Sequence, residues 1–258
     1  MIIKRKKKKL PPASFKKRTY RKIVNPDGLI PFEVKVRETD LQILATADLA
    51  AEAYHLVFQY RNHLESYISG HPDFLTSLTP LSFDSLAPPI IKDMQGAGRA
   101  AGVGPMAAVA GAIAEFVGRD LLDMDGISEV VVENGGDIFM HRTSESVISI
   151  FSGTSALSYR IGIRIDENRM PVGICTSSGT VGHSLSLGSA DSVTVLSRSV
   201  SLADAAATRL GNEIMDKQDI SKALDLAKTI PGLIGVVVIL GREFGAWGDV
   251  ELAPLSDK

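Results

Sequence analysis

The sequence predicts an α+β fold in which antiparallel sheets are packed with helices. In the C-terminal half, six short apolar or alternating segments follow one another through tight turns, without a helix between each pair. Strands joined in this way pair antiparallel, whereas parallel strands need longer crossover connections. Elsewhere apolar residues recur at the spacing of one helix face, which predicts helices that cover the sheets.

The strands are expected where β-branched residues are enriched or where apolar and polar residues alternate. They are expected at residues 30–36, 41–45, 129–132, 138–141, 147–151, 159–165, 172–175, 192–196, 233–240 and 247–252. The last two are expected to form a closing hairpin.

The helices are expected at residues 47–68, 90–101, 106–122, 202–215 and 220–228. The third is rich in Ala and Gly, which allows close approach to its neighbours. No apolar run reaches the roughly 18–20 residues of a membrane span, and no apolar segment of a secretory signal follows the basic N-terminus. The single cysteine, Cys175, excludes an internal disulfide and a cysteine-cluster zinc site. We therefore expect a cytoplasmic protein.

Charge divides the chain into a basic extension and an acidic body. Residues 1–22 contain eleven of the 28 Lys and Arg residues and no acids, so 17 basic residues face 30 acidic ones in the rest, a net charge of −13. Such a run stays solvated because it repels itself. We expect a flexible, solubilising extension over residues 1–22 and a single domain over 23–258. The alternative is an arm that tethers the body to nucleic acid.

Two glycine-rich segments invite a ligand-binding interpretation. Residues 102–107 lack the preceding strand that a dinucleotide-binding fingerprint requires, so we exclude a Rossmann site there. Asn134-Gly135 between two strands is typical of a two-residue hairpin turn. The next two residues add a functional interpretation, because Gly136 lets backbone amides approach a ligand and Asp137 can bind a hydroxyl or an amide.

A third segment offers hydroxyl groups at the end of a strand. Thr176, Ser177, Ser178 and Gly179 combine donors with a flexible backbone, and we treat them as candidate ligand-binding residues. His183 follows and is the one histidine near a candidate site, so it is the candidate acid–base or binding residue. A lone histidine more often has a structural role, which is the alternative for His183.

Asp204 and Thr208 lie four residues apart in a predicted helix, so their oxygens project from one face. A carboxylate and a hydroxyl suit Mg²⁺, which prefers oxygen ligands and shares its shell with phosphates and water. The structural alternative is a capping box that begins at Ser201 and uses Asp204 at its third position. The two interpretations can coexist.

In this order the motifs resemble the ApbE-like family, flavin transferases that bind FAD with magnesium and move FMN onto a protein threonine. Asn134 to Ile138 match its Asn-x-Gly-Gly-Asp-Ile turn, and Thr176 to Gly179 with His183 match its Thr-Ser-Gly…His segment. Residues 192–195 and 203–208 match Ser-Val-Thr-Val…Ala-Asp-Ala-x-x-Thr, whose acid and threonine hold magnesium. Residues 38–41 and 101–108 resemble one branch of this superfamily.

The chain also departs from the family pattern. Ala110 and Glu115 stand where the family helix has Lys and Asp, and the Asp and Pro that follow the family histidine are missing after His183. The lost lysine removes a point charge for phosphate.

The resemblance implies a duplicated, tunnelling-fold-like arrangement with a ligand cleft between its halves. It also implies a small-molecule nucleotide, FAD or a relative, bound with magnesium, and a protein acceptor for a transfer reaction. The alternative is a non-catalytic nucleotide-binding or assembly protein on the same scaffold, in which the helix at 106–122 packs subunits into a homo-oligomer.

Overall fold

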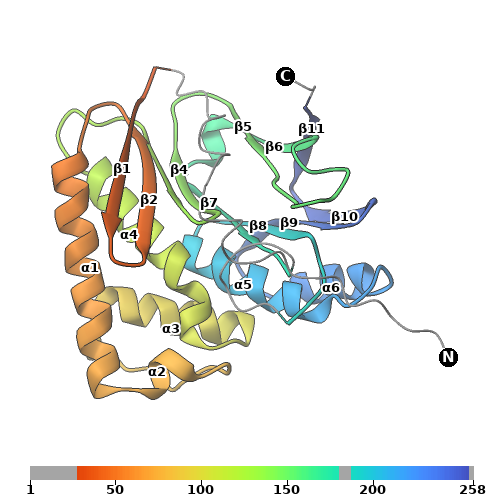
Figure 1. Cartoon of the computed structure of the whole chain (residues 1–258), viewed down its shortest axis with the longest axis horizontal. Coiled ribbons are helices and arrows are strands. Elements are labelled where there is room, and N and C mark those ends of the chain that lie inside the picture. Colours follow the sequence, from red (N-terminus) through yellow and green to blue (C-terminus); the bar gives the residue numbers. More distant parts are fainter. Residues whose placement is uncertain (1–27, 180–186, 256–258) are drawn as a thin grey trace.

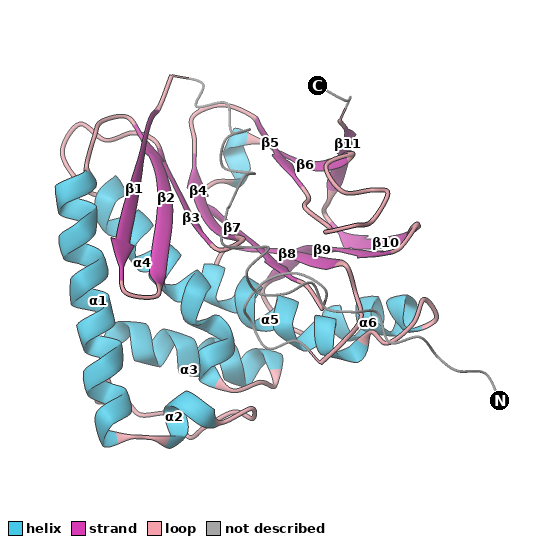
Figure 2. Cartoon of the chain, viewed as in Figure 1, coloured by secondary structure: helices cyan, strands magenta, loops and turns pink. Residues whose placement is uncertain are grey.

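The computed structural model describes residues 28–179 and 187–255. The basic extension and His183 therefore lie outside the described residues. Helices, a large sheet and a small sheet form three layers, with the large sheet in the middle (Figures 1 and 2). The predicted α+β class with antiparallel sheets is confirmed.

Eight antiparallel strands make the large sheet, in the order β1-β2-β3-β4-β7-β8-β9-β10. Their bounds are Ile30–Val36 (β1), Thr39–Ala45 (β2), Val130–Asn134 (β3), Asp137–His141 (β4), Val172–Ser177 (β7), Ser192–Ser197 (β8), Leu233–Leu240 (β9) and Glu243–Gly248 (β10). Only the β4–β7 step between spatial neighbours skips strands along the chain. Most neighbouring strands are therefore consecutive in the sequence, in agreement with the antiparallel pairing predicted from the short connections.

The small sheet contains β5 (Ser146–Ser149), β6 (Ile161–Ile165) and β11 (Glu251–Pro254), in the order β11-β6-β5. The predicted strand at 247–252 is therefore wrong, because it joins the end of β10 to the start of β11. Gly248 has a φ of +86°, which favours glycine, and the chain leaves the large sheet there. The closing hairpin is β9–β10 instead, whereas β11 pairs with β6.

The helices cover one face of the large sheet (Figure 2). They are α1 (Ala50–Gly70), α2 (Asp73–Thr76), α3 (Pro89–Ala101), α4 (Val109–Leu122), α5 (Val200–Glu213) and α6 (Asp219–Ala227), together with the 3-10 turn η3 (Pro105–Ala108). A second 3-10 turn, η4 (Glu167–Arg169), follows β6 and lies on the side of the small sheet. Within the described residues no single helix is long and apolar enough to cross a bilayer. Among the described helices, one pair, α3 with residues 105–122, is long and apolar enough when taken together, but it is bent by 104°.

Two hydrophobic cores lie on opposite faces of the large sheet. On the helix side, residues such as Ile43, Val57 and Val195 are fully buried between the sheet and the helices. On the other side, residues such as Ile163 and Ile174 are buried between the two sheets. Successive residues of a strand alternate between the faces, so β7 places Ile174 in the second core and Cys175 in the first.

Candidate functional site

One row of paired residues crosses the large sheet beneath α5. Asn134 pairs with Asp137 across the β3–β4 hairpin, Asp137 pairs with Cys175, and Cys175 pairs with Val195. Cys175 and Val195 belong to the helix-side core. Paired residues share a face of a sheet, so Asn134 and Asp137 also face the helices.

The turn between β3 and β4 differs by one residue from the prediction. Asn134 is the last residue of β3, and the two turn residues are Gly135 and Gly136. Their φ values are +71° and +111°, which explains why both are glycine. The Gly136 amide donates to Oε1 of Glu133 at 2.8 Å, so it is bound within the chain. Asn134 is therefore a strand residue and not a turn residue, and its side chain points towards the helices.

Asn134 and Asp204 both bind the first turn of α4. Nδ2 of Asn134 donates to the Ala110 carbonyl at 3.0 Å, and the Gly111 amide donates to Oδ2 of Asp204 at 2.9 Å. Residues 110 and 111 are adjacent, so the β3–β4 hairpin and α5 converge at one point. The sequence analysis did not identify α4 as the element that joins these two segments.

The carboxylates of Asp137 and Asp204 lie close enough to affect each other. Burial raises the pKa of Asp137 well above its ordinary value, the negative charge of Asp204 raises it further, and hydrogen bonds from Cys175 and the Thr176 backbone lower it. Burial raises the pKa of Asp204 to about 7, although hydrogen bonds from the Gly111 and Ala110 backbone lower it. Both shifts follow from the cost of holding negative charge away from water.

The beginning of α5 does not match the predicted capping box. The N-cap is Ser199, whose side chain accepts a hydrogen bond from the Leu202 amide at 3.2 Å. Ser201 is instead buried and donates its hydroxyl hydrogen to Asp93 on α3. The first turn of α5 contains no acid, so Asp204 is not part of a cap. The contact with Gly111 holds the Asp204 carboxylate near Asp137 on the large sheet.

Thr176 and Ser177 lie on opposite faces of β7. The Thr176 hydroxyl lies 2.9 Å from that of Thr194, on the face turned to the small sheet, because Cys175 faces the helices. Ser177 points to α5, where a Cβ added to Gly211 would lie 3.5 Å from its Oγ. Gly179 donates its amide to the Ala190 carbonyl at 2.9 Å. The four residues therefore do not present one continuous row of hydroxyl groups to α5.

The available donor set suits a hard cation that keeps water in its shell. Asp204 and Thr208 offer a carboxylate and a hydroxyl, and both side chains are half-buried. No group of three or more His, Cys, Asp or Glu side chains within residues 28–179 and 187–255 could hold a metal ion. An all-protein cage is therefore absent from this part of the chain. Mg²⁺ is commonly bound by one or two carboxylates together with phosphates and water, which these residues fit.

Sequence reasoning missed the importance of Gly111. A Cβ at this position would lie 2.6 Å from the Val200 carbonyl oxygen and 2.8 Å from Cβ of Asp204, so only glycine permits the hydrogen bond between α4 and α5. A glycine inside a helical pattern signals such a close approach. The signal does not say which segment approaches.

A family model described as "AbpE bacteria" matches residues 21–252. The chain belongs to this family. UPF0280 proteins are similar over nearly the whole chain: the protein of Methanococcus aeolicus is 38% identical over 235 residues, which cover 89% of this chain and 94% of that protein. A UPF0280 protein of Methanococcus maripaludis is 40% identical over 234 residues, which cover 88% and 94%. The resemblance to an ApbE-like branch is confirmed.

The fold is also similar to that of a solved ApbE protein. The crystal structure of the ApbE protein of Thermotoga maritima gives a TM-score of 0.54 at 12% identity, covering 84% of this chain and 96% of that one. At this identity the likeness concerns the fold alone.

Proposed function

We propose that this chain binds FAD or a related nucleotide together with Mg²⁺ and uses it in flavin or nucleotidyl transfer, or in cleavage of its pyrophosphate. The observation that carries the proposal is the convergence of Asn134 and Asp204 on residues 110 and 111 of α4. Membership of the family and the order of the matching motifs support the choice of ligand.

In this proposal Asp204 and Thr208 hold the metal ion from one face of α5. When bound, Mg²⁺ supplies a positive charge that polarises a pyrophosphate and stabilises its leaving phosphate. The pair of Asp137 and Asp204 is compatible with a cation, because burial raises the pKa of both carboxylates and the negative charge of Asp204 raises the pKa of Asp137 further. Asp137 reaches ligand hydroxyl or amide groups from the other side of the site.

The turn residues provide the remaining contacts of the proposal. Gly135 and Gly136 leave the tip of the hairpin without side chains, and Ser177, Ser178 and Gly179 extend from the end of β7. His183 is the proposed acid–base or binding residue, and it lies outside the described residues. If the reaction is a transfer, the proposal includes a protein that accepts the transferred group.

Calorimetric titration with FAD, FMN and ATP, each with and without Mg²⁺, tests this proposal. We expect heat of binding with at least one nucleotide, and we expect Asp204→Ala to remove its magnesium-dependent part, because a metal ligand is lost. Asp225→Ala is the matched control. Asp225 is an exposed acid on α6, the helix that follows α5, and it pairs with Lys228. No heat with any nucleotide, or equal magnesium dependence in both variants, would contradict the proposal.

A non-catalytic nucleotide-binding protein is the second candidate. It is favoured by Ala110, because the motif lysine that would neutralise a phosphate is missing and the Ala110 carbonyl is bound by Asn134. Product analysis after incubation with FAD and Mg²⁺ separates the two candidates. Release of FMN and AMP supports pyrophosphate cleavage, whereas bound but intact FAD with a range of acceptor proteins supports the binding role.

A further inference from the structure

The carboxylate of Glu115 on α4 lies against the N-terminus of α5. Glu115 is 6% exposed, and its Oε2 accepts hydrogen bonds from the amides of Val200 at 2.6 Å and Ser201 at 3.3 Å. The first amides of a helix have no partner within the helix. Ser199 binds the next amide, that of Leu202. Three consecutive amides are thus bound by two side chains, one of which comes from a different helix.

The second oxygen of Glu115 is also occupied. Oε1 accepts hydrogen bonds from Nε and Nη2 of Arg119, at 3.0 and 2.7 Å, and the Arg119 guanidinium lies 5.8 Å from the centre of the Phe139 ring. Glu115 therefore accepts four hydrogen bonds from its own chain and its charge is paired. It stands where the family motif has an aspartate, but in this arrangement its carboxylate is directed to a helix end and not to a ligand.

The contact with Glu115 is the first of two that fix α5 against α4. One turn along each helix, the Gly111 amide donates to Asp204 at 2.9 Å. Glu115 and Gly111 are four residues apart on α4, as are Val200 and Asp204 on α5, so the two contacts form an antiparallel pair. Because helices are stiff over one turn, the position of Val200 on Glu115 determines where Asp204 lies along α4.

We propose that Glu115 is a positioning residue that holds the Asp204 carboxylate at the ligand site by binding the first amides of α5. The proposal rests on the function proposed above for Asp204. It differs from a merely stabilising cap, because it requires the Asp204–Gly111 contact to change when Glu115 is altered.

The test uses Glu115→Gln in the full-length protein. Glutamine has nearly the same shape, but only one of its two terminal atoms can accept a hydrogen bond, so it cannot serve both the amides and Arg119. Site-resolved hydrogen exchange is measured on the amides of Val200, Ser201 and Gly111. We expect exchange to become at least about tenfold faster at all three, since each loses an acceptor or its correct position.

Ile163→Ala is the control, because Ile163 is fully buried between the two sheets, on the face away from the helices. Both variants are compared at a temperature at which they are fully folded. We expect the control to leave exchange at Gly111, Val200 and Ser201 unchanged relative to the rest of the helices. Unchanged exchange at Val200 and Ser201 in Glu115→Gln would overturn the claim that Glu115 holds the first amides of α5. Faster exchange there with no change at Gly111 would reduce Glu115 to a cap.

Ligand binding provides the second measurement. We expect Glu115→Gln to weaken magnesium-dependent FAD binding about tenfold and Ile163→Ala to leave it unchanged. Equal loss in both variants would contradict positioning. If the wild-type protein binds no nucleotide, the proposed function fails, whereas the exchange rate at Gly111 still decides whether Glu115 positions Asp204.

Discussion

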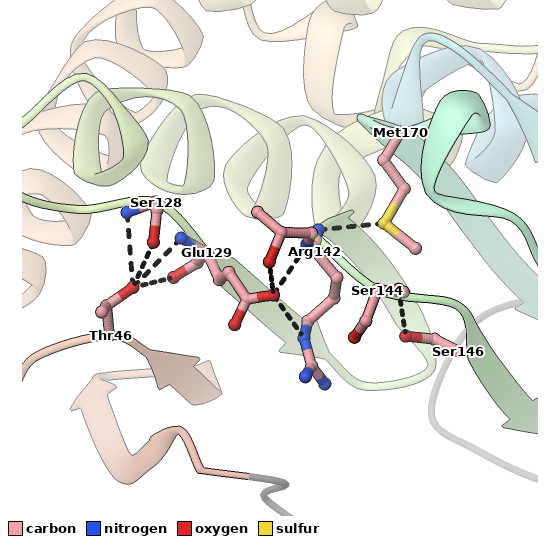
Figure 3. A network of polar contacts seen from close by, with 8 residues as sticks. Thr46, Ser128, Glu129, Arg142, Ser144, Ser146 and Met170 are labelled. Carbon is pink, nitrogen blue, oxygen red and sulfur yellow. Dashed lines mark hydrogen bonds and ion pairs between the residues drawn. The ribbon is translucent and has the colours of Figure 1, made fainter.

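At the scale of single residues, largely buried acids join neighbouring elements through several hydrogen bonds. Glu129 is an example outside the candidate site (Figure 3). Its Oε1 accepts hydrogen bonds from the amide and hydroxyl of Thr143, at 2.7 and 2.8 Å, and from Nε of Arg142 at 3.2 Å. The Arg142 side chain is 9% exposed. Glu129 therefore connects the start of β3 to the end of β4.

Glu129→Gln should lower the free energy of unfolding at pH 7 by about 1–3 kcal/mol, because hydrogen bonds to a charged group are lost. Burial raises the pKa of Glu129, but the hydrogen bonds from Thr143 and Arg142 and the charge of Arg142 lower it by more, so the net shift is downward. A depressed pKa stabilises the fold above the ordinary glutamate value of about 4.3. This stabilisation is lost as the pH falls through the lower, folded-state pKa.

Urea unfolding between pH 7 and pH 3 measures this effect. The difference in stability between wild type and Glu129→Gln should be constant at neutral pH and should shrink below about pH 4.3. Glu145→Gln is the control, because Glu145 forms an exposed ion pair with Arg164 and such pairs contribute little. A difference that persists unchanged at pH 3 would contradict the assignment.

The sequence predicts candidate site residues, but it does not predict their contacts. The spacing of Asp204 and Thr208 predicts that their oxygens share one helix face, because a helix repeats every 3.6 residues. The partner of Asp204 is the Gly111 amide, 93 residues earlier, and no local pattern encodes a contact between segments so far apart. The sequence predicts Ser201 as the N-cap, whereas the structure uses Ser199, because both serines are suitable N-cap residues and they lie two positions apart.

At the scale of elements, α5 is held close to its neighbours by small residues. A Cβ on Gly111 would lie 2.6 Å from the Val200 carbonyl oxygen, and one on Gly173 of β7 would lie 2.7 Å from Cα of Val200. Glycines therefore face Val200 from both the helix and the sheet side. Gly111, one of the small residues at 106–122, thus allows α4 and α5 to approach each other within one chain. A contact between subunits is not needed to explain this glycine.

Gly111→Ala should destabilise the protein by about 1–3 kcal/mol, because the added methyl group must separate α4 from α5. Gly96→Ala is the matched control, since Gly96 lies on the exposed side of α3 with nothing within 4 Å of an added Cβ. Alanine in an exposed helix position should stabilise by about 0.5–1 kcal/mol. Chemical denaturation measures both, and equal effects of the same sign would refute the close contact.

The limits of the sequence interpretation at this scale are clearest near the C-terminus. Trp247, Val250 and Leu252 suit a strand, so the sequence predicts one strand over 247–252. The break is set by Gly235, where an added Cβ would lie 2.3 Å from the Val250 side chain, and by the +86° φ of Gly248. The end of β10 thus depends on where the chain leaves one sheet for the other. Local composition does not encode this position.

At the scale of the whole molecule, one sheet separates two hydrophobic cores. Val237 and Ile239 of β9 face the second core, while Val236 and Val238 face the helices. The strands are therefore buried on both faces, which explains their nearly continuous runs of apolar residues. The two cores share the central strands, so global unfolding of one side removes the strands that support the other.

We therefore expect the described body to unfold as one cooperative unit. Ile163→Ala empties space between the two sheets and should cost about 2–5 kcal/mol. Val57→Ala removes a fully buried side chain from α1 on the opposite face. Both should lower the midpoint of a single transition, followed by the fluorescence of Trp247 on β10 and by the circular dichroism of the helices. Trp247 packs against the helix-side core, so both signals report the large sheet and its helices. If Val57→Ala lowered the midpoint of this transition and Ile163→Ala left it in place, the small sheet would be a separate folding unit.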